Sequence, residues 1–445
     1  MTNPRVLTVA TLAACLCVAL LVGSRAGGVV VTKLSTHSVL LAPPSGAAVP
    51  KVASLHAVAC PLTGGCWGVG DFQLPGELTQ PMVVLRSSGH WARAGTLRLP
   101  ADADPQGYAS LSAVSCATAT TCVAVGIYTS PPTGIRTGNQ LPMVAFEVQG
   151  RWGRARDIGL PGNAARGGAR TGDASAVACD RRARCTLVGT YTTAAGRSRS
   201  FRAAAVVDGS DAELSPGEAL PFSDLHSSLG AGPESVSLAG LACSGPSRCT
   251  AVGSASVGHG SNSVPVVETE VRGTWAPPIA APLPPTVAPK TASAWLSGLA
   301  CPSPARCVAV GGVQTATGGD AGALVDVFAA GTWHWSTPPP VAQFLEQVSC
   351  AGDRNCVAVG EVWTMPAMSS VSSVSAVVAT GSIAGLTATT VVHLPSGVPG
   401  AADRRNLQSV ACVPSAMCTA VGTVANVVPH IISYIYPVAT TFSAR

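Results

Sequence analysis

Charged residues are scarce in this 445-residue sequence: 11% are Asp, Glu, Lys or Arg, and the formal net charge is only +5. Lysine is almost absent, with Lys33, Lys51 and Lys290 as its three occurrences. The basic residues form no cluster or stripe along the chain. Because nucleic-acid binding needs a concentrated basic surface, this composition argues against a nucleic-acid partner.

Aromatic residues are also few, at 4% of the chain. After residue 26, no segment has the periodicity of an amphipathic helix. Runs rich in valine and threonine, bounded by glycine and proline, occur throughout instead, and such runs predict β-strands. The sequence therefore predicts an all-β fold.

Fourteen of the 16 cysteines form seven pairs with the spacing Cys-x5-Cys. That spacing is unusual for zinc, no histidine recurs beside the pairs, and redox pairs are usually Cys-x-x-Cys. Repeated even pairing instead predicts local disulfides formed in an oxidising compartment. We expect no metal or other cofactor. The predicted disulfides join Cys60 to Cys66, Cys116 to Cys122, Cys179 to Cys185, Cys243 to Cys249, Cys301 to Cys307, Cys350 to Cys356, and Cys412 to Cys418.

Each cysteine pair begins a longer repeated unit. Successive first cysteines lie between 49 residues (Cys301 to Cys350) and 64 residues (Cys179 to Cys243) apart. Propeller blades span about 40–50 residues, so these units read as blades with enlarged loops. Four strands are expected in each. The first enters the first cysteine, the second leaves the second cysteine toward a Val-Gly pair, the third is valine-rich, and the fourth usually ends at proline. Small residues in the first two strands suit the crowded centre of a propeller.

The last unit lacks a fourth strand after its predicted third strand at residues 431–435. Residues 38–43 resemble the other fourth strands, so we expect the N-terminus to close the last blade and remove an exposed sheet edge. The prediction is a single seven-bladed β-propeller of four-stranded blades over residues 37–436. One disulfide is expected in each blade, and residues 437–445 are expected to form a C-terminal tail.

The N-terminal residues indicate export. Residues 6–23 are apolar and follow Arg5, and Ser24 and Ala26 resemble a signal-peptidase site. The 18-residue run also reaches the lower limit for a membrane-spanning helix. Residues 1–26 are therefore a signal peptide or a membrane anchor, with a linker at 27–36. The protein is expected to be secreted, or anchored to the outer face of the cytoplasmic membrane by residues 6–23, its only membrane contact.

One candidate site lies four residues before the first cysteine of each pair. In the predicted ring the sixth, seventh and first units are contiguous, so Glu346, Gln408 and His56 would gather at the channel mouth, on the face that carries the long loops. A histidine near a carboxylate can transfer protons or bind a polar ligand. The alternative is that these positions simply face water in the channel. The seven positions are His56, Ser112, Ser175, Ala239, Ser297, Glu346 and Gln408.

The repeated motif Val-x-Cys-x5-Cys-x-Ala-Val-Gly, with Gly-x-Trp turns as at Gly89/Trp91, resembles the Cys-hairpin propeller repeats of secreted actinobacterial proteins. More broadly it is similar to WD-repeat and related seven-bladed propellers. The resemblance covers residues 37–436 and implies the fold, but it carries over no catalytic residue.

We therefore expect an extracytoplasmic binding module, a monomer, that takes a protein, peptide or glycan ligand of the cell envelope on its long-loop face. A propeller enzyme, either a lyase or a glycan-active hydrolase, is the alternative, and a purely structural envelope component is a third possibility. The binding module leads because a glycosidase needs two carboxylates, and the sequence places only Glu346 at the mouth.

Overall fold

A computed structural model describes residues 36–47, 52–61, 65–76, 78–132, 138–221, 233–245, 247–257, 262–288, 292–315, 321–364, 373–395, 404–428 and 431–443. The chain divides into two units, Met1–Val30 and Val31–Arg445. The predicted signal or anchor segment at 1–26 lies outside the described residues. Within the described ranges, no helix is long and apolar enough to cross a membrane.

The regular secondary structure of the described residues consists of strands and one 3-10 turn, η1 (Gly167–Ala169). Each cysteine pair joins a first strand to a second strand. The first strands are β2 (Ala53–Ala59), β7 (Ala109–Thr118), β12 (Gly172–Cys179), β17 (Pro233–Gly245), β22 (Ala292–Ser303), β26 (Phe344–Cys350) and β30 (Arg404–Cys412). The second strands are β3 (Cys66–Gln73), β8 (Thr121–Thr129), β13 (Arg184–Thr192), β18 (Arg248–Val257), β23 (Arg306–Thr315), β27 (Cys356–Thr364) and β31 (Met417–Val428).

Third and outer strands complete each unit. The third strands are β4 (Thr79–Ser87), β9 (Gln140–Val148), β14 (Ser198–Asp208), β19 (Ser263–Val271), β24 (Ala321–Ala329), β28 (Ser373–Ser382) and β32 (Ile431–Ser443). The outer strands are β5 (His90–Trp91) with β6 (Gly95–Thr96), β10 (Arg151–Trp152) with β11 (Arg156–Asp157), β15 (Asp211–Leu214) with β16 (Glu218–Ala219), β20 (Thr274–Trp275) with β21 (Ile279–Ala280), β25 (Thr332–Trp335), β29 (Gly385–Val391) and β1 (Thr36–Leu40).

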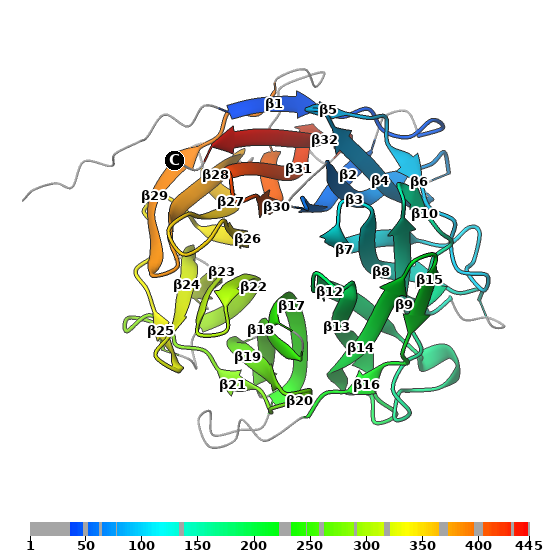
Figure 1. The fold of residues 1–445 in the computed structure, drawn as a ribbon, viewed down its shortest axis with the longest axis horizontal. Helices are drawn as coiled ribbons and strands as arrows, with labels where there is room; N and C mark the ends of the chain where they lie inside the picture. The colour runs from blue at the N-terminus through cyan, green and yellow to red at the C-terminus, as the bar shows by residue number, and fades with distance from the viewer. Residues whose placement is uncertain are drawn as a thin grey trace, which may run out of the picture. The chain divides into compact units, whose positions relative to one another are not determined.

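The units succeed one another around a centre lined by the first strands (Figure 1). Along the chain β2 contacts β7, β7 contacts β12, and the series continues to β30, which contacts β2 again. Within a unit, neighbouring strands pair antiparallel. This all-β arrangement is that of a β-propeller, in which each sheet buries both faces against its neighbours.

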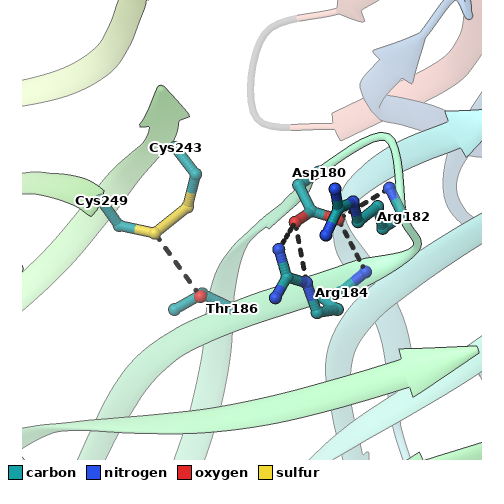
Figure 2. A network of polar contacts seen from close by, with 6 residues as sticks. All are labelled: Asp180, Arg182, Arg184, Thr186, Cys243 and Cys249. Carbon is teal, nitrogen blue, oxygen red and sulfur yellow. Dashed lines mark hydrogen bonds and ion pairs between the residues drawn. A yellow bond between two sulfur atoms is a disulfide. The ribbon is translucent and has the colours of Figure 1, made fainter. Parts of the chain in front are cut away.

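The seven predicted disulfides are all present, with Cα–Cα distances of 4.0–4.2 Å. These distances are close to the roughly 4.5 Å of non-hydrogen-bonded pairs in an antiparallel ladder. Figure 2 shows the Cys243–Cys249 disulfide beside the turn of the preceding unit that carries Asp180 and Arg184. The Cys249 Sγ lies 3.5 Å from Thr186 Oγ1 of the preceding unit, while Asp180 accepts hydrogen bonds from the Arg184 side chain and the Arg182 backbone N–H. The cysteine turns thus make structural contacts.

The outer strand is shorter than the sequence predicted. The fourth strand was expected to run to a proline, whereas in the first unit it consists of two two-residue pieces, β5 and β6, and ends at Thr96. The reason lies in the Gly-x-Trp turn. Ser88 and Gly89 both have positive φ, of 50° and 85°, as a type I′ hairpin turn requires. The chain therefore folds back tightly at Trp91 before it leaves the sheet edge.

The last unit is closed by the N-terminal strand, with β1 pairing antiparallel to β32 from Thr36 opposite Phe442 to Leu40 opposite Val438. The predicted third strand at 431–435 is confirmed as the start of β32, but the predicted tail at 437–445 is wrong, because β32 continues to Ser443. Pro437 lies opposite Thr423, in the register that Pro81 occupies opposite Asp71 in the first unit, and both prolines are buried.

Every first strand contains a β-bulge, in which one residue has no partner on the second strand. Pairing with the second strand continues at the next residue, which is alanine, glycine, serine or glutamine. The extra residues are His56, Ser112, Ser175, Ala239, Ser297, Glu346 and Gln408. Opposite each bulge lies the glycine of the Val-Gly pair. A Cβ on that glycine would lie 1.9–2.1 Å from a carbonyl oxygen of the first strand. The glycine is therefore required by this backbone approach, rather than by crowding at the axis.

We expect Gly126→Ala to destabilise the protein by about 3 kcal/mol, the upper part of the range for overpacked cores. The new Cβ would lie 2.0 Å from the Ser110 carbonyl oxygen. Urea unfolding of disulfide-intact protein measures the change. Gly162→Ala is the matched control, because a Cβ added there would meet nothing within 4 Å and the φ of Gly162 is not positive. Equal stability of the two variants would contradict the bulge argument.

Four carboxyl groups are buried in third strands, and two of them, Asp326 and Glu268, have the most strongly raised pKa values. Asp326 has no exposed surface, and neither of its oxygens has a hydrogen-bond partner among the described residues. Burial raises its pKa to about 8. Glu268 is 1% exposed and accepts a hydrogen bond of 3.2 Å from Ser200 Oγ, and burial raises its pKa to about 8 as well. Both groups are therefore neutral in the folded protein at pH 7.

These carboxyls ionise near pH 4 in the unfolded chain, so only the unfolded state loses their protons between about pH 4 and pH 8. Their contribution to stability is complete below pH 4 and is lost as the pH rises toward 8. We expect Asp326→Asn to raise the thermal midpoint at pH 8 relative to the wild type, and to have a smaller effect at pH 5. Thermal unfolding at both pH values checks this, and the same change at both would contradict it.

Candidate functional site

A central cavity of about 450 Å³ is lined by the first strands of all the units. The seven bulge residues named above all line it, including His56, Glu346 and Gln408. A bulge re-aims a side chain that would otherwise alternate between sheet faces, which explains why these positions reach the cavity. The structure thus places the three candidate residues on one cavity, while their role as ligand contacts stays a prediction.

The carboxylate beside His56 is Asp71, not Glu346. His56 Nε2 lies 3.5 Å from Asp71 Oδ2, and His56 Nδ1 lies 3.1 Å from the Leu111 carbonyl oxygen. Asp71 Oδ2 also accepts a hydrogen bond of 2.7 Å from Ser110 Oγ. No hydrogen bond or ion pair joins His56, Glu346 and Gln408 to one another in the described part of the chain. The three share a cavity without forming one constellation.

Glu346 has a carboxylate partner of its own, Glu361. Burial, and then the negative charge of Glu361, raise the pKa of Glu346 above its ordinary value. Glu361 follows Gly360 on β27, and it holds the position that Asp71 holds after Gly70 on β3. When one carboxyl of such a pair has a raised pKa, it can stay protonated and act as a proton donor, while the second stays ionised and can act as a base.

Three aromatic rings adjoin this pair. Trp295 stacks on Phe344 with ring centroids 5.6 Å apart and planes at 22°, and Trp363 meets Phe344 edge-on at 5.8 Å. The Trp363 indole N–H donates a hydrogen bond of 2.7 Å to Glu361 Oε1. Trp363 is 44% exposed. We call Glu346, Glu361, Trp295, Phe344 and Trp363 the aromatic–carboxylate cluster.

Gly312 makes room for the stacked rings. A Cβ at this position would lie 2.6 Å from Phe344 Cδ1 and 2.8 Å from Trp295 Cζ2. Gly312 follows the glycine of the Val-Gly pair, and the residues in the same position are Asp71 in the first unit and Glu361 in the sixth. Because Phe344 begins β26 and Cys350 ends it, the aromatic–carboxylate cluster lies at the end of the cavity away from the cysteine turns, which is the long-loop end.

Neither Asp71, Glu361 nor the three rings were singled out from the sequence. The signal for the two carboxylates was present, since each directly follows the repeated Val-Gly pair. The rings come from β22, β26 and β27, and only the pairing of strands brings them together. Within the described residues, no group of three or more His, Cys, Asp or Glu side chains is placed to hold a metal ion.

The sequence matches no protein-family model, and no curated protein matches it. Solved structures do resemble the fold. A Trypanosoma rangeli sialidase in complex with the inhibitor DANA has a TM-score of 0.47 at 9% identity, over 78% of this chain and 57% of that one. The chain thus spans little more than half of that sialidase.

Two further structures cover more of their own length. The parainfluenza virus 5 hemagglutinin-neuraminidase ectodomain has a TM-score of 0.42 at 9% identity, over 92% of this chain and 85% of that one. A polysaccharide lyase, the PL25 ulvan lyase bound to a saccharide, has a TM-score of 0.47 at 12% identity, over 90% of this chain and 95% of that one.

The expectation of a binding module that is not an enzyme is corrected. It depended on finding a single carboxylate at the mouth, and Glu361 is a second one, close enough to raise the pKa of Glu346. The candidates predicted from the sequence all lie on first strands, whereas Glu361 lies on the second strand β27.

We expect Glu361→Gln to lower the pKa of Glu346, because it removes the negative charge that opposes ionisation of that carboxyl. The pKa should stay above its ordinary value, since burial remains. Side-chain carboxyl NMR of ¹³C-labelled protein measures it. Asp71→Asn is the matched control, and it should leave the Glu346 titration unchanged. An unchanged pKa in Glu361→Gln would contradict the coupling.

Proposed function

We propose that this protein is a glycan-active enzyme, a hydrolase or lyase, with its site at the long-loop mouth of a single seven-bladed β-propeller. The observation that carries the proposal is the coupled pair Glu346 and Glu361 beside three aromatic rings. The count of seven blades is supported by the seven disulfide-linked hairpins, each with a third strand, and by first strands that contact one another in a closed series.

Glu346 is the proton donor in this proposal. Its raised pKa favours the protonated carboxyl that a general acid needs near neutral pH. Glu361 acts as the carboxylate of the pair. In a hydrolase it would activate water or attack the sugar, and in a lyase it would remove a proton from the sugar. The Trp363 indole N–H, which donates to Glu361 Oε1, would hold that carboxylate in position.

The aromatic rings supply the binding surface. Sugar rings carry apolar C–H faces that pack on exposed aromatic faces, while their hydroxyls need polar partners. Trp363 is the exposed ring of the three, and Trp295 and Phe344 are half-buried. His56 and Gln408 line the adjoining cavity and would contact the part of the glycan that enters it, and Asp71 pairs with His56.

We further propose that the protein works outside the cytoplasm, as a monomer, on a glycan of the cell envelope. Support comes from the seven disulfides, which require an oxidising compartment, and from the apolar run at residues 6–23, which would direct export or anchor the chain. We propose no nucleic-acid partner and no cofactor.

The test is an activity screen of purified, disulfide-intact full-length protein against neutral and acidic polysaccharides. Reducing-end release detects either reaction, and ultraviolet absorbance of an unsaturated uronate identifies a lyase. On a substrate that is turned over, we expect Glu346→Gln and Glu361→Gln each to lower kcat at least about 100-fold, the usual worth of a general acid or base. Glu218→Gln, which removes an exposed carboxylate on β16, should retain full activity.

The aromatic surface has its own prediction. Trp363→Ala should raise KM several-fold, because the aromatic contact with the sugar ring is lost. It should also lower kcat, because Glu361 Oε1 loses the hydrogen bond that holds it in position. Steady-state kinetics on the same substrate measures both constants. If no polysaccharide is turned over, or if the Glu346→Gln and Glu361→Gln variants remain fully active, the proposed function is wrong.

A further inference from the structure

A second cavity, of about 560 Å³, lies where the N-terminal strand closes the ring. Its walls come from β1, from the end of β32, and from β4 with the following turn and β5. In the strand register, Arg86 lies opposite Cys66. Thr36 lies opposite Phe442, and Phe442 in turn lies opposite Cys418. The cavity therefore lies at the cysteine-turn end, away from the aromatic–carboxylate cluster. We call it the seam pocket. The lining residues that matter here are His37, Arg86, His90, Trp91, Arg93 and Thr441.

The seam pocket is basic. Two guanidinium groups and two imidazoles line it, and no acidic side chain of the described residues does. In the described part of the chain, neither Arg86 nor Arg93 makes an ion pair or a side-chain hydrogen bond. Uncompensated positive charge in a concave site attracts anions, and guanidinium groups bind carboxylate, sulfate and phosphate through paired hydrogen bonds.

The charge is special to this unit, rather than part of the repeat. Arg86 is the register partner of Trp91. In the second and fourth units the residues in the same position, opposite the same tryptophan, are Glu147 and Glu270. Those two carboxyls are buried, at 0% and 7% exposure. The first unit therefore carries the opposite charge at this position, in an open pocket, at the one place where the two ends of the ring meet.

We propose that the seam pocket binds an acidic sugar unit, with its anionic group between Arg86 and Arg93 and its ring against Trp91. The Trp91 indole lines the pocket and is only partly buried, so it offers the aromatic face that a sugar ring packs on. The volume falls within the range of about 300–1,000 Å³ that ligand sites occupy. This site uses none of the residues of the proposed active site.

Binding would also join the two ends of the ring. His37 and Thr441 belong to β1 and β32, whereas Arg86 and Trp91 belong to the first unit. A ligand that contacts all of them binds only the closed, folded protein, so it raises the unfolding midpoint as its concentration rises above its dissociation constant.

The probes are tetragalacturonate, maltotetraose and inorganic sulfate, with affinity measured by calorimetry and stability by thermal unfolding of the full-length protein. We expect tetragalacturonate to bind and to raise the unfolding midpoint, sulfate to bind more weakly, and maltotetraose not to bind. Arg86→Gln/Arg93→Gln should weaken tetragalacturonate binding at least tenfold. The matched control is Arg151→Gln/Arg154→Gln, which removes the same charge from the corresponding turn of the second unit and should leave the affinity unchanged.

Trp363→Ala separates the two sites, since binding at the seam pocket should persist in it even if the aromatic–carboxylate cluster has no activity. If Arg86→Gln/Arg93→Gln and Arg151→Gln/Arg154→Gln lost the same affinity for tetragalacturonate, the binding would be nonspecific charge attraction and the proposal would be overturned. Sulfate binding as tight as that of tetragalacturonate would reduce the site to one for simple anions and overturn its assignment to a sugar. Absence of binding by tetragalacturonate would overturn it outright.

Discussion

The close approach between a first-strand carbonyl and the glycine of the second strand governs the rest of this structure. It occurs in all seven hairpins and leaves no room for a Cβ. The carbonyl belongs to a bulged strand, and the bulge turns one extra side chain per unit toward the central cavity. In the sixth unit this extra side chain is Glu346.

Local features of the fold could be predicted because short segments of the sequence determine them. Paired cysteines six positions apart specify a hairpin wherever they occur, and the valine-rich runs specify its partner strands. Features set by register could not be predicted in the same way. Pro437 looks like a terminator when read alone, yet it fits the strand because Thr423 lies opposite it. The outer strand was overestimated for a similar reason, since the type I′ turn at Gly89 decides where the chain leaves the sheet.

The candidate site shows the same division. His56, Glu346 and Gln408 were found by counting back from a cysteine, and counting works because the bulge lies at a fixed distance from it. Glu361 could have been found by counting forward to the residue after Val-Gly. The aromatic rings could not, because Trp295 and Phe344 belong to different units and meet only above Gly312. A site assembled across sheets depends on the packing of those sheets, which no single repeat contains.

The pairing of β1 with β32 has a consequence for the order in which the protein forms. The five residues of β1 leave the ribosome before any cysteine hairpin, and their partners between Val438 and Phe442 leave it after the last of these hairpins. Each disulfide closes a short local loop and can form as its own hairpin emerges. The ring can close only when both β1 and β32 are present, across a loop of about 400 residues, whose closure entropy exceeds that of a hairpin by only a few kcal/mol. Oxidised but still open chains should therefore precede the native protein, each with an unpaired edge at its last sheet.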